Sequence, residues 1–274
     1  MHPLTRTGNM IGRSRRFHTI LLSVGTIIFL IALWVFLTPE HVSELTFPSP
    51  HSVWEAVKVL RLNLVEHSIY TLGRVLAGWV LGAVLGIVIG LAMTWSRVFY
   101  SVVNPVIEAV RPLPPIALIP FFIIWFGLSV SGQIILIALG CFMVLAVNTY
   151  VAVQNLPAIY VQAASSFGAS RRQIYWTVII PAILPTLVSG FRIAAALAFG
   201  TAVAAEFMGA QSGLGYMIMV ARRTLNTNTI LLGTIIIGLE SFLLDSFIRW
   251  LSRRRFMSWS ETPLEVIQQL GAKV

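Results

Sequence analysis

The feature that most constrains this sequence is a series of apolar segments, each about long enough to cross a lipid bilayer as a helix. A bilayer core about 30 Å thick needs about 20 apolar residues in an α-helix. The apolar runs are 17–37, 72–94, 113–128, 133–153, 186–208 and 230–250. Backbone polar groups in lipid must be paired within the protein, which favours helices over irregular chain. The sequence therefore predicts an all-α fold, a polytopic membrane bundle of six transmembrane helices.

The composition excludes two broad classes of protein. Of 274 residues, 57% are hydrophobic and only 11% are charged, whereas a soluble domain carries about 25% charged residues. The net charge is +9, but the bases are too sparse and too interrupted by apolar runs to indicate a nucleic-acid partner. A chain whose bases lie at a membrane face, in contact with membrane lipids, is the better interpretation.

The distribution of the bases predicts the topology. They gather at the two ends of the chain, and basic residues are enriched on the cytoplasmic side of membranes. These end residues are Arg6, Arg13, Arg15, Arg16, Arg249, Arg253, Arg254, Arg255 and Lys273. We therefore expect cytoplasmic N- and C-termini and an even number of spans. Arg222 and Arg223 fall on the outer side in this arrangement and break the rule.

The same reasoning divides the chain into three parts. Residues 1–67 hold a cytoplasmic tail, a retained first transmembrane helix and an external amphipathic segment, while 252–274 form a cytoplasmic tail. Residues 68–251 form the transmembrane core, with a cytoplasmic loop at 155–176. In the external segment, Ser52 and Glu55 have the spacing of a capping box, which predicts a helix from there to about residue 66.

Two helical stripes of small residues predict tight packing. Gly78, Gly82, Gly86 and Gly90 recur every four residues in the second run, and this spacing lets a neighbouring backbone approach closely. The fifth run carries a similar stripe of Gly190, Ala194, Ala198 and Ala202. The third run is short and rich in proline, and the stretch before it, 98–110, is expected to feed a bent span.

The loop between the fourth and fifth runs carries clear helix-boundary signals. A short helix of small residues is expected to end at Gly168, which suits the left-handed position after a helix. Ser170 and Gln173 then form a capping box that begins a second helix. Pro181 and Pro185 are expected to bend the entry into the fifth span. A small-residue helix lying across the membrane face has the form of a docking element.

Charged residues inside the apolar runs are expected to be paired or to line a pathway, because an unpaired charge in a bilayer is costly. Arg192 lies in the fifth run, and Glu240 and Asp245 lie in the sixth. We expect Arg192 to form a structural ion pair with one of these two acids.

Three other polar residues are candidates for a translocation path. Glu206, near the outer end of the fifth run, either pairs with Arg222 or lines the outer mouth of the path. Asn148 and Thr149 of the fourth run are candidates for lining the pore. Polar side chains inside membrane bundles commonly mark substrate pathways.

No enzyme signature is present in the sequence. It contains no Gly-Lys pair, so a Walker A phosphate loop is absent, and it contains no G-x-S-x-G nucleophile motif. Its five histidines have no metal-ligand spacing, and Asp245 is the only aspartate. The sequence therefore predicts no catalytic residue, no metal and no cofactor.

Several segments together resemble the "EAA"-loop permeases of binding-protein-dependent ABC importers, in the nitrate, sulfonate and taurine branch. The resemblance covers about residues 47–250. The segments that carry it are Phe47-Pro48-Ser49-Pro50, Arg111-Pro112-Leu113-Pro114-Pro115, Ile124-Trp125-Phe126-Gly127, Gln162-Ala163-Ala164 with Gly168-Ala169, Pro181-Ala182-Ile183-Leu184-Pro185, Ala204-Ala205-Glu206 and Gly213-Leu214-Gly215. The resemblance implies a type I ABC importer permease fold in a bacterial inner membrane.

The resemblance also implies partners and a docking site. Residues 158–170 would be the coupling helix that docks into an ABC ATPase subunit, with two ATPase copies and a second permease copy in the complex. A periplasmic or lipid-anchored substrate-binding protein would deliver a small anion such as a sulfonate, taurine or nitrate. The expected docking residues are Gln162, Ala163, Ala164, Gly168, Ala169, Ser170, Arg171 and Arg172. Gln162 replaces the glutamate of the family, which keeps a hydrogen-bonding group but removes the charge.

Two alternative functions remain open at this point. The first is an ABC permease for an uncharged vitamin precursor, since related permeases transport such solutes. The second is an ion-coupled secondary transporter that works alone, which would need a coupling-ion site at the midplane and usually shows internal repeats. No repeat is evident in the sequence. An intramembrane enzyme is a more distant third.

Overall fold

The computed structural model describes residues 22, 25, 26, 28–36, 38 and 48–256. The chain divides into two compact units, Met1–Arg61 with Val220–Leu232 and Leu62–Met219 with Gly233–Val274. The expected N-terminal tail, Phe47 and most of the C-terminal tail lie outside the described residues. Of the predicted first span, the described residues 22, 25, 26 and 28–36 are helical.

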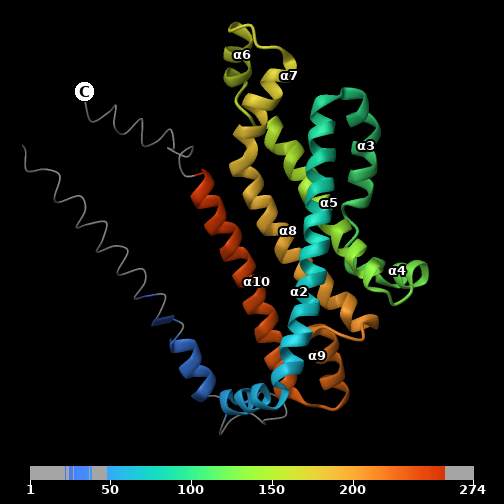
Figure 1. The fold of residues 1–274 in the computed structure, drawn as a ribbon, viewed down its shortest axis with the longest axis vertical. Helices are drawn as coiled ribbons and strands as arrows, with labels where there is room; N and C mark the ends of the chain where they lie inside the picture. Colours follow the sequence, from blue (N-terminus) through green and yellow to red (C-terminus); the bar gives the residue numbers. More distant parts are fainter. Residues whose placement is uncertain (1–21, 23–24, 27, 37, 39–47, 257–274) are drawn as a thin grey trace, which may run out of the picture. The chain divides into compact units, whose positions relative to one another are not determined.

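All regular structure in the described part of the chain is helical, in agreement with the predicted all-α class (Figure 1). The long helices are α2, α5, α8 and α10, and the shorter ones connect them. The elements are α2 (Pro50–Trp95), α3 (Arg97–Val110), η1 (Pro115–Leu118), α4 (Ile119–Phe126), α5 (Val130–Gln154), α6 (Ala158–Ser166), α7 (Arg171–Ile174), η2 (Tyr175–Ile179), α8 (Ile180–Gly209), α9 (Leu214–Arg223) and α10 (Thr227–Phe256).

Four helices among the described residues are long and apolar enough to cross a membrane, or five if α3 and the η1–α4 segment together count as one broken span. Within the proline-rich run 113–128, residues 115–126 are helical, as η1 followed directly by α4. Pro112, Pro114 and Pro115 interrupt the backbone hydrogen bonds there, and α3 meets the η1–α4 segment at 85°. The expectation that 98–110 feeds a bent span is confirmed, while the count of six spans remains a prediction.

The start of α2 also differs from its prediction. The helix begins at Pro50, and the Oγ of Ser49 accepts a hydrogen bond from the backbone N–H of Ser52 at 3.1 Å. Ser49 is therefore the cap in place of Ser52, because proline fits the first helical position, where no N–H partner is needed. The helix is kinked at Arg61, which has φ 32° and ψ −104°.

The glycine stripe of α2 packs against α5, as predicted. A β-carbon on Gly78 would lie 2.6 Å from the β-carbon of Ile137, and one on Gly86 would lie 2.8 Å from the carbonyl oxygen of Phe142. One on Gly90 would lie 2.7 Å from the carbonyl oxygen of Ala146. The two backbones are thus in contact over three helical turns, at a separation that any larger residue would prevent.

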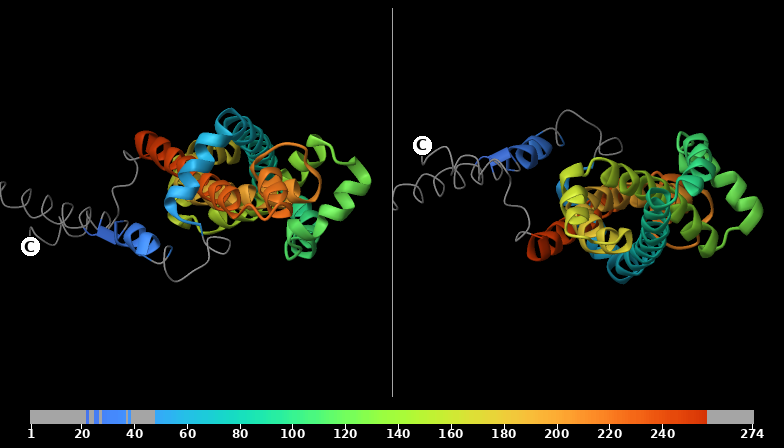
Figure 2. Two further views of the ribbon diagram at one scale, coloured as in Figure 1. Left: turned by 90° about the horizontal axis from the view of Figure 1, so that it is seen from below. Right: turned by 90° about the horizontal axis from the view of Figure 1, so that it is seen from above.

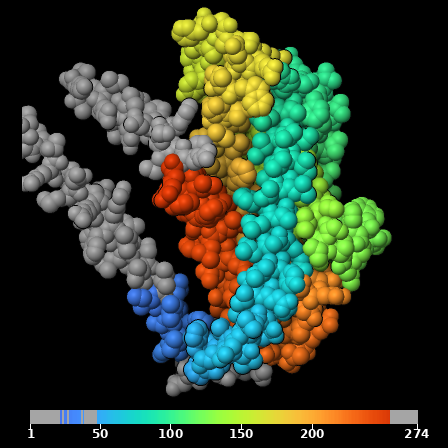
Figure 3. Space-filling model, viewed as in Figure 1, coloured from blue at the N-terminus to red at the C-terminus, as the bar shows by residue number. Residues whose placement is uncertain are grey.

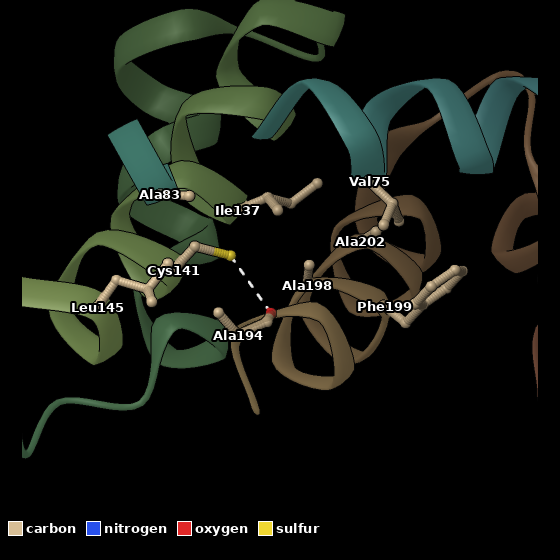
Figure 4. Close-up of a cluster of buried hydrophobic side chains, with 9 residues drawn as sticks. All are labelled: Val75, Ala83, Ile137, Cys141, Leu145, Ala194, Ala198, Phe199 and Ala202. Carbon is tan, nitrogen blue, oxygen red and sulfur yellow. Dashed lines mark hydrogen bonds between the residues drawn. The ribbon is translucent and has the colours of Figure 1, made fainter. Parts of the chain in front are cut away.

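The central apolar cluster joins α2, α5 and α8 (Figure 4). Its members are small or medium-sized and fully or nearly fully buried, and they are Val75, Ala83, Ile137, Cys141, Leu145, Ala194, Ala198, Phe199 and Ala202. The alanines continue the small-residue stripe predicted on the fifth run. The thiol of Cys141 lies 3.4 Å from the carbonyl oxygen of Ala194 and donates a weak hydrogen bond to it. The three helices therefore form the tightest part of the bundle.

The chain enters α8 as a continuous helix that contains one wide, π-helical turn. The sequence predicts a bend at this place. Residues 171–209 form one continuous helical segment of 39 residues, in which η2 is a π-helical turn just before Pro181. The N–H of Ile180 bonds to the carbonyl of Tyr175, five residues earlier. Because proline has no N–H and its ring crowds the preceding turn, the wider turn accommodates Pro181 without breaking the helix.

We expect Gly86→Ala to destabilise the protein. The added methyl group would meet the backbone of α5, and overpacking of this kind costs about 1–3 kcal/mol. Gly73→Ala is the matched control in the same helix, because a β-carbon there has nothing within 4 Å. Thermal unfolding of the detergent-solubilised chain should show a lower midpoint for Gly86→Ala only. Equal midpoints for the two variants would contradict the close α2–α5 contact.

Candidate functional site

The segment from α6 to η2 projects from one end of its unit. Its α6 part lies beyond the end of α2 in the space-filling view (Figure 3) and faces the viewer in the end-on view (Figure 2, right). No residue of α6 is buried. Ile159 and Tyr160 are more than half exposed, and Phe167, just after α6, is 92% exposed. A nine-residue helix without a buried face gains little stability from packing within its own chain.

The end of α6 is a complete Schellman motif. Gly168 has φ +78°, the left-handed conformation predicted for it. Its N–H bonds to the carbonyl of Ser165 at 2.9 Å, and the N–H of Ala169 bonds to the carbonyl of Ala164 at 3.1 Å. These are the two bonds that define the motif. The motif fixes the direction in which the chain leaves α6, so Phe167 is held outward on an ordered turn.

The capping box that begins α7 is confirmed. The Oγ of Ser170 accepts from the backbone N–H of Gln173, and the Gln173 side chain accepts from the backbone N–H of Ser170 at 2.8 Å. Both bonds satisfy N–H groups that the first turn of a helix leaves without partners. The connection between α6 and α7 is therefore defined at both ends by local hydrogen bonds.

Arg171 fastens this segment to the end of α2. Its guanidinium donates to the backbone carbonyl of Trp95 and lies 4.9 Å from the centroid of the Trp95 ring. Tyr175 packs edge-on against the same ring, and its hydroxyl donates to the carbonyl of Leu91 at 2.6 Å. Arg171 is thus bonded within the chain while remaining exposed, and its contact with an ATPase stays a prediction. Arg172 and Gln162 are exposed.

A buried polar network lies at the C-terminal end of α8, around Glu206. The Glu206 side chain is inaccessible to solvent and forms an ion pair with Arg74 of α2, Nη1 to Oε1, at 2.6 Å. Thr71 donates to both of its carboxylate oxygens, at 2.9 and 3.0 Å. Arg74, and not the expected Arg222, is therefore the ion-pair partner of Glu206, while a role of Glu206 at the mouth of a path stays a prediction. The carboxylate oxygens accept hydrogen bonds from α2 and from the segment that follows α8.

The same network holds the start of α9. The backbone N–H of Gly215 donates to Glu206 at 2.8 Å, and that of Leu214 donates to Thr71 at 2.7 Å. A carboxylate at a helix N-terminus satisfies free N–H groups and is favoured by the helix dipole. A β-carbon on Gly215 would lie 2.8 Å from the β-carbon of Glu206. The Glu206 side chain therefore explains why glycine is needed in this segment.

The sequence did contain a signal for this pairing. Arg74 is the only charged residue in the apolar run 72–94, and such a base needs a partner. The pattern of residues could not indicate which acid is the partner. Arg74 also donates to the carbonyl of Ser212 at 2.8 Å and to its hydroxyl at 2.7 Å, contacts set entirely by the tertiary fold.

Glu240 and Asp245, the two acids of α10, have different partners in the structure. Arg192 lies 2.5 Å from Asp245, Nε to Oδ1, with both side chains partly exposed. Asp245 also pairs with Arg249 one turn further on. Glu240 instead accepts a hydrogen bond from Ser68 of α2. Of the two acids expected as partners of Arg192, the structure brings Asp245 to it.

Of the residues expected to line a translocation path, Asn148 lines a pocket. Thr149 is fully buried, with its hydroxyl bonded to the carbonyl of Leu145 at 2.6 Å, so it faces no path in this structure. Asn148 is partly exposed and lines a pocket of about 250 Å³ between the α3–η1 turn, α5 and α8. Arg111 lines the same pocket.

The sequence matches a known protein family and several of its members. Residues 82–257 match the family of binding-protein-dependent transport system inner membrane components. The chain is 34% identical to the taurine transport system permease protein TauC of Escherichia coli, over 85% of this chain and 88% of that protein. It is also 34% identical to the putative aliphatic sulfonates transport permease protein SsuC of Bacillus subtilis, over 80% of this chain and 79% of that one.

A solved structure shares the fold. The chain resembles a protein chain in the inward-facing MetNI methionine ABC transporter, with a TM-score of 0.59 and 23% sequence identity, over 72% of this chain and 99% of that one. At this identity the likeness concerns the fold alone. Together with the family match and the two permeases, it confirms the predicted type I importer fold. This chain therefore belongs to the family of binding-protein-dependent transport system inner membrane components and is a permease subunit of an ABC importer.

Proposed function

We propose that two copies of this permease form the translocation path, that two ATPase subunits dock on them, and that a substrate-binding protein delivers solute to the outer face. The α6–η2 segment then lies in the cytoplasm, as do both termini. Topology follows the distribution of basic residues, which favour the cytoplasmic side. The absence of a Gly-Lys pair from the sequence accords with ATP hydrolysis in a separate subunit.

The observation that carries this proposal is the exposed and locally rigid α6. It has no buried residue, it presents Ile159, Tyr160 and Phe167 outward, and both ends of its connection to α7 are capped. Exposed apolar side chains on an ordered element are typical of a protein–protein contact. Gln162 and the exposed Arg172 would add polar contacts at the rim of that interface.

The segment is also built to transmit movement. Its C-terminal side runs without a break into α8, and Arg171 and Tyr175 attach it to the end of α2 through Trp95 and Leu91. A displacement of α6 by the ATPase would therefore move α2 and α8 together. ATP-driven closure of the ATPases would in this way shift the bundle between inward-facing and outward-facing states.

A small organic anion is the solute class that we propose. The support is the likeness to permeases whose names specify taurine and aliphatic sulfonates. Competition by taurine and by ethanesulfonate for uptake in cells that express the complete transporter would identify this class. An uncharged vitamin precursor as the sole effective competitor would overturn it.

We assign a structural role to the Glu206 network. Thr71, Arg74 and the N–H groups at the start of α9 converge on a carboxylate that solvent does not reach. The network would hold the segment after α8 against α2 at the outer end of the bundle. Solute selection would then depend on other side chains.

The first prediction of this proposal concerns Gly168, whose left-handed backbone disfavours β-branched residues. Gly168→Val should abolish co-purification of the partner ATPase, while membrane insertion is retained. Gly168→Asn is the matched control, because asparagine tolerates this conformation, and it should retain most of the bound ATPase. If Gly168→Val retained the ATPase as well as Gly168→Asn does, the α6–α7 geometry would have no part in docking.

The second prediction concerns Phe167, the most exposed apolar side chain of the segment. Truncating an aromatic anchor at the centre of an interface commonly costs 2 kcal/mol or more, so Phe167→Ala should weaken ATPase binding at least about tenfold. Ser166→Ala, which removes only a hydroxyl bonded to the carbonyl of Gln162, should bind as the native chain does. Titration of nanodisc-embedded permease with the ATPase measures both affinities, and equal values would place Phe167 outside the interface.

The third prediction separates a structural role of Glu206 from a pathway role. Glu206→Gln leaves the Arg74 charge buried without its counter-charge, which costs about 3–5 kcal/mol, so the unfolding midpoint should fall clearly. Adding Arg74→Met to this variant should recover part of the loss. Glu55→Gln, at an exposed pair with Lys58, should leave the midpoint unchanged. A stable Glu206→Gln protein with impaired uptake would instead support the pathway role.

A further inference from the structure

The pocket beside Asn148 lies at the middle depth of the bundle. Two of its lining residues, Met143 and Leu197, are the central residues of the apolar runs 133–153 and 186–208. The turn between α3 and α4, which forms another wall, is level with the middle of α8 (Figure 1). In a bilayer, the pocket would therefore lie far from both surfaces, where a charge is costly.

A basic side chain nevertheless lies at this depth. Arg111 caps the end of α3, where its N–H bonds to the carbonyl of Ile107 at 2.7 Å, and its side chain lines the pocket. Its side chain pairs with Glu108, 3.5 Å away between Nη1 and Oε1, and the two side chains are 53% and 55% exposed. Half-exposed charges at mid-depth are not stable against lipid. This face must therefore meet water or protein.

The chemistry of the pocket is simple. Among its lining residues, Arg111 is the one charged side chain and Asn148 the one uncharged polar side chain; the walls are otherwise apolar or glycine. The Asn148 amide donates one N–H to the carbonyl of Val144 at 3.2 Å, which leaves its second N–H for a ligand. The cationic Arg111 and the neutral Asn148, both hydrogen-bond donors, thus line one pocket whose other walls are apolar or glycine.

The size of the pocket suits a small solute. Its volume is about 250 Å³, many times the about 10–15 Å³ that a cavity needs to hold one water molecule. Gly140 contributes to this space, because a β-carbon there would lie 3.1 Å from Pro115 and 3.4 Å from Leu197. A few-atom alkyl chain with a compact anionic head would fill it.

We infer that Arg111 and Asn148 form an anion-binding half-site for a small organosulfonate or a similar oxyanion, in the broken span between α3 and α4. The inference rests on the proposed function, which supplies a reason for solute to reach this depth. Arg111 binds the anionic head through its guanidinium, Asn148 adds an N–H donor, and the walls around Met143 and Leu197 contact the alkyl part. Secondary transporters commonly bind their solutes at discontinuous helices near the midplane, and the same physical arrangement is present here.

The test uses a single reactive cysteine in the pocket, introduced as Val147→Cys in a Cys141→Ala background. The chain in nanodiscs is treated with an anionic methanethiosulfonate, the sulfonatoethyl reagent, or with its cationic trimethylammonioethyl counterpart. Arg111 should favour the anionic reagent, so Arg111→Gln should lower the ratio of anionic to cationic labelling rates at least about tenfold. Arg111→Lys should largely preserve the ratio. Ser166→Cys on exposed α6 corrects for reagent reactivity.

Ligand protection supplies an independent readout. Millimolar ethanesulfonate should slow labelling of Val147→Cys by the cationic reagent, and tetramethylammonium should not. Asn148→Leu should weaken this protection while the charge preference remains. An unchanged ratio in Arg111→Gln, or no protection by ethanesulfonate, would overturn the half-site. Protection by anionic phospholipid in place of ethanesulfonate would overturn it in favour of a lipid headgroup site.

The same experiment distinguishes failure of the half-site from failure of the proposed function. Labelling requires neither ATPase nor binding protein, whereas co-purification of the ATPase with the native chain tests the importer assignment alone. An absent charge preference with normal ATPase binding removes only the half-site. Anion protection without any bound ATPase would keep the half-site and overturn the docking proposal.

Discussion

The close contact of α2 with α5 is the constraint on which the rest of the bundle depends. The backbones approach at Gly78, Gly86 and Gly90, where a β-carbon would meet α5 at less than 3 Å. Lipid offers no hydrophobic drive for helices to associate, so packing of small residues and polar contacts must hold them together. The alanines of α8 complete this contact around Cys141. The result is a dense centre of three helices, α2, α5 and α8, which share one buried apolar cluster.

Polar contacts then hold α2 at two places. Near its middle, Arg74 and Thr71 bind the Glu206 carboxylate and, through it, the start of α9. At its C-terminal end, the Trp95 carbonyl and ring contact Arg171, and the Leu91 carbonyl accepts a hydrogen bond from the hydroxyl of Tyr175. Buried polar groups are stable only when their partners are complete. Because α2 carries both sets, it links the proposed ATPase-docking segment to the start of α9.

The sequence predicted local features well, and tertiary pairing poorly. The turn at Gly168 and the Ser170–Gln173 box depend on neighbouring residues and on torsion preferences, so a pattern is sufficient to locate them. The partner of Glu206 is 132 residues away, and no local rule selects Arg74 over Arg222. The α2 cap was misplaced for a different reason: Ser49 and Ser52 are both acceptable caps, and Pro50 decides between them through its missing N–H.

The broken span of α3, η1 and α4 depends both on local sequence and on the tertiary fold. Its prolines identified an irregular segment, but a proline pattern does not give the angle of a bend or the side chain that the bend presents. The 85° bend lies next to Arg111, whose side chain lines a pocket together with residues of α5. The prolines between α3 and α4 remove backbone hydrogen bonds, which destabilises this segment. The packing of α2, α5 and α8 offsets this loss. In the half-site that we infer, the bend lets Arg111, whose contact with Glu108 is exposed, share a pocket with Asn148, and an anion is the ligand that a cation in such a place would favour.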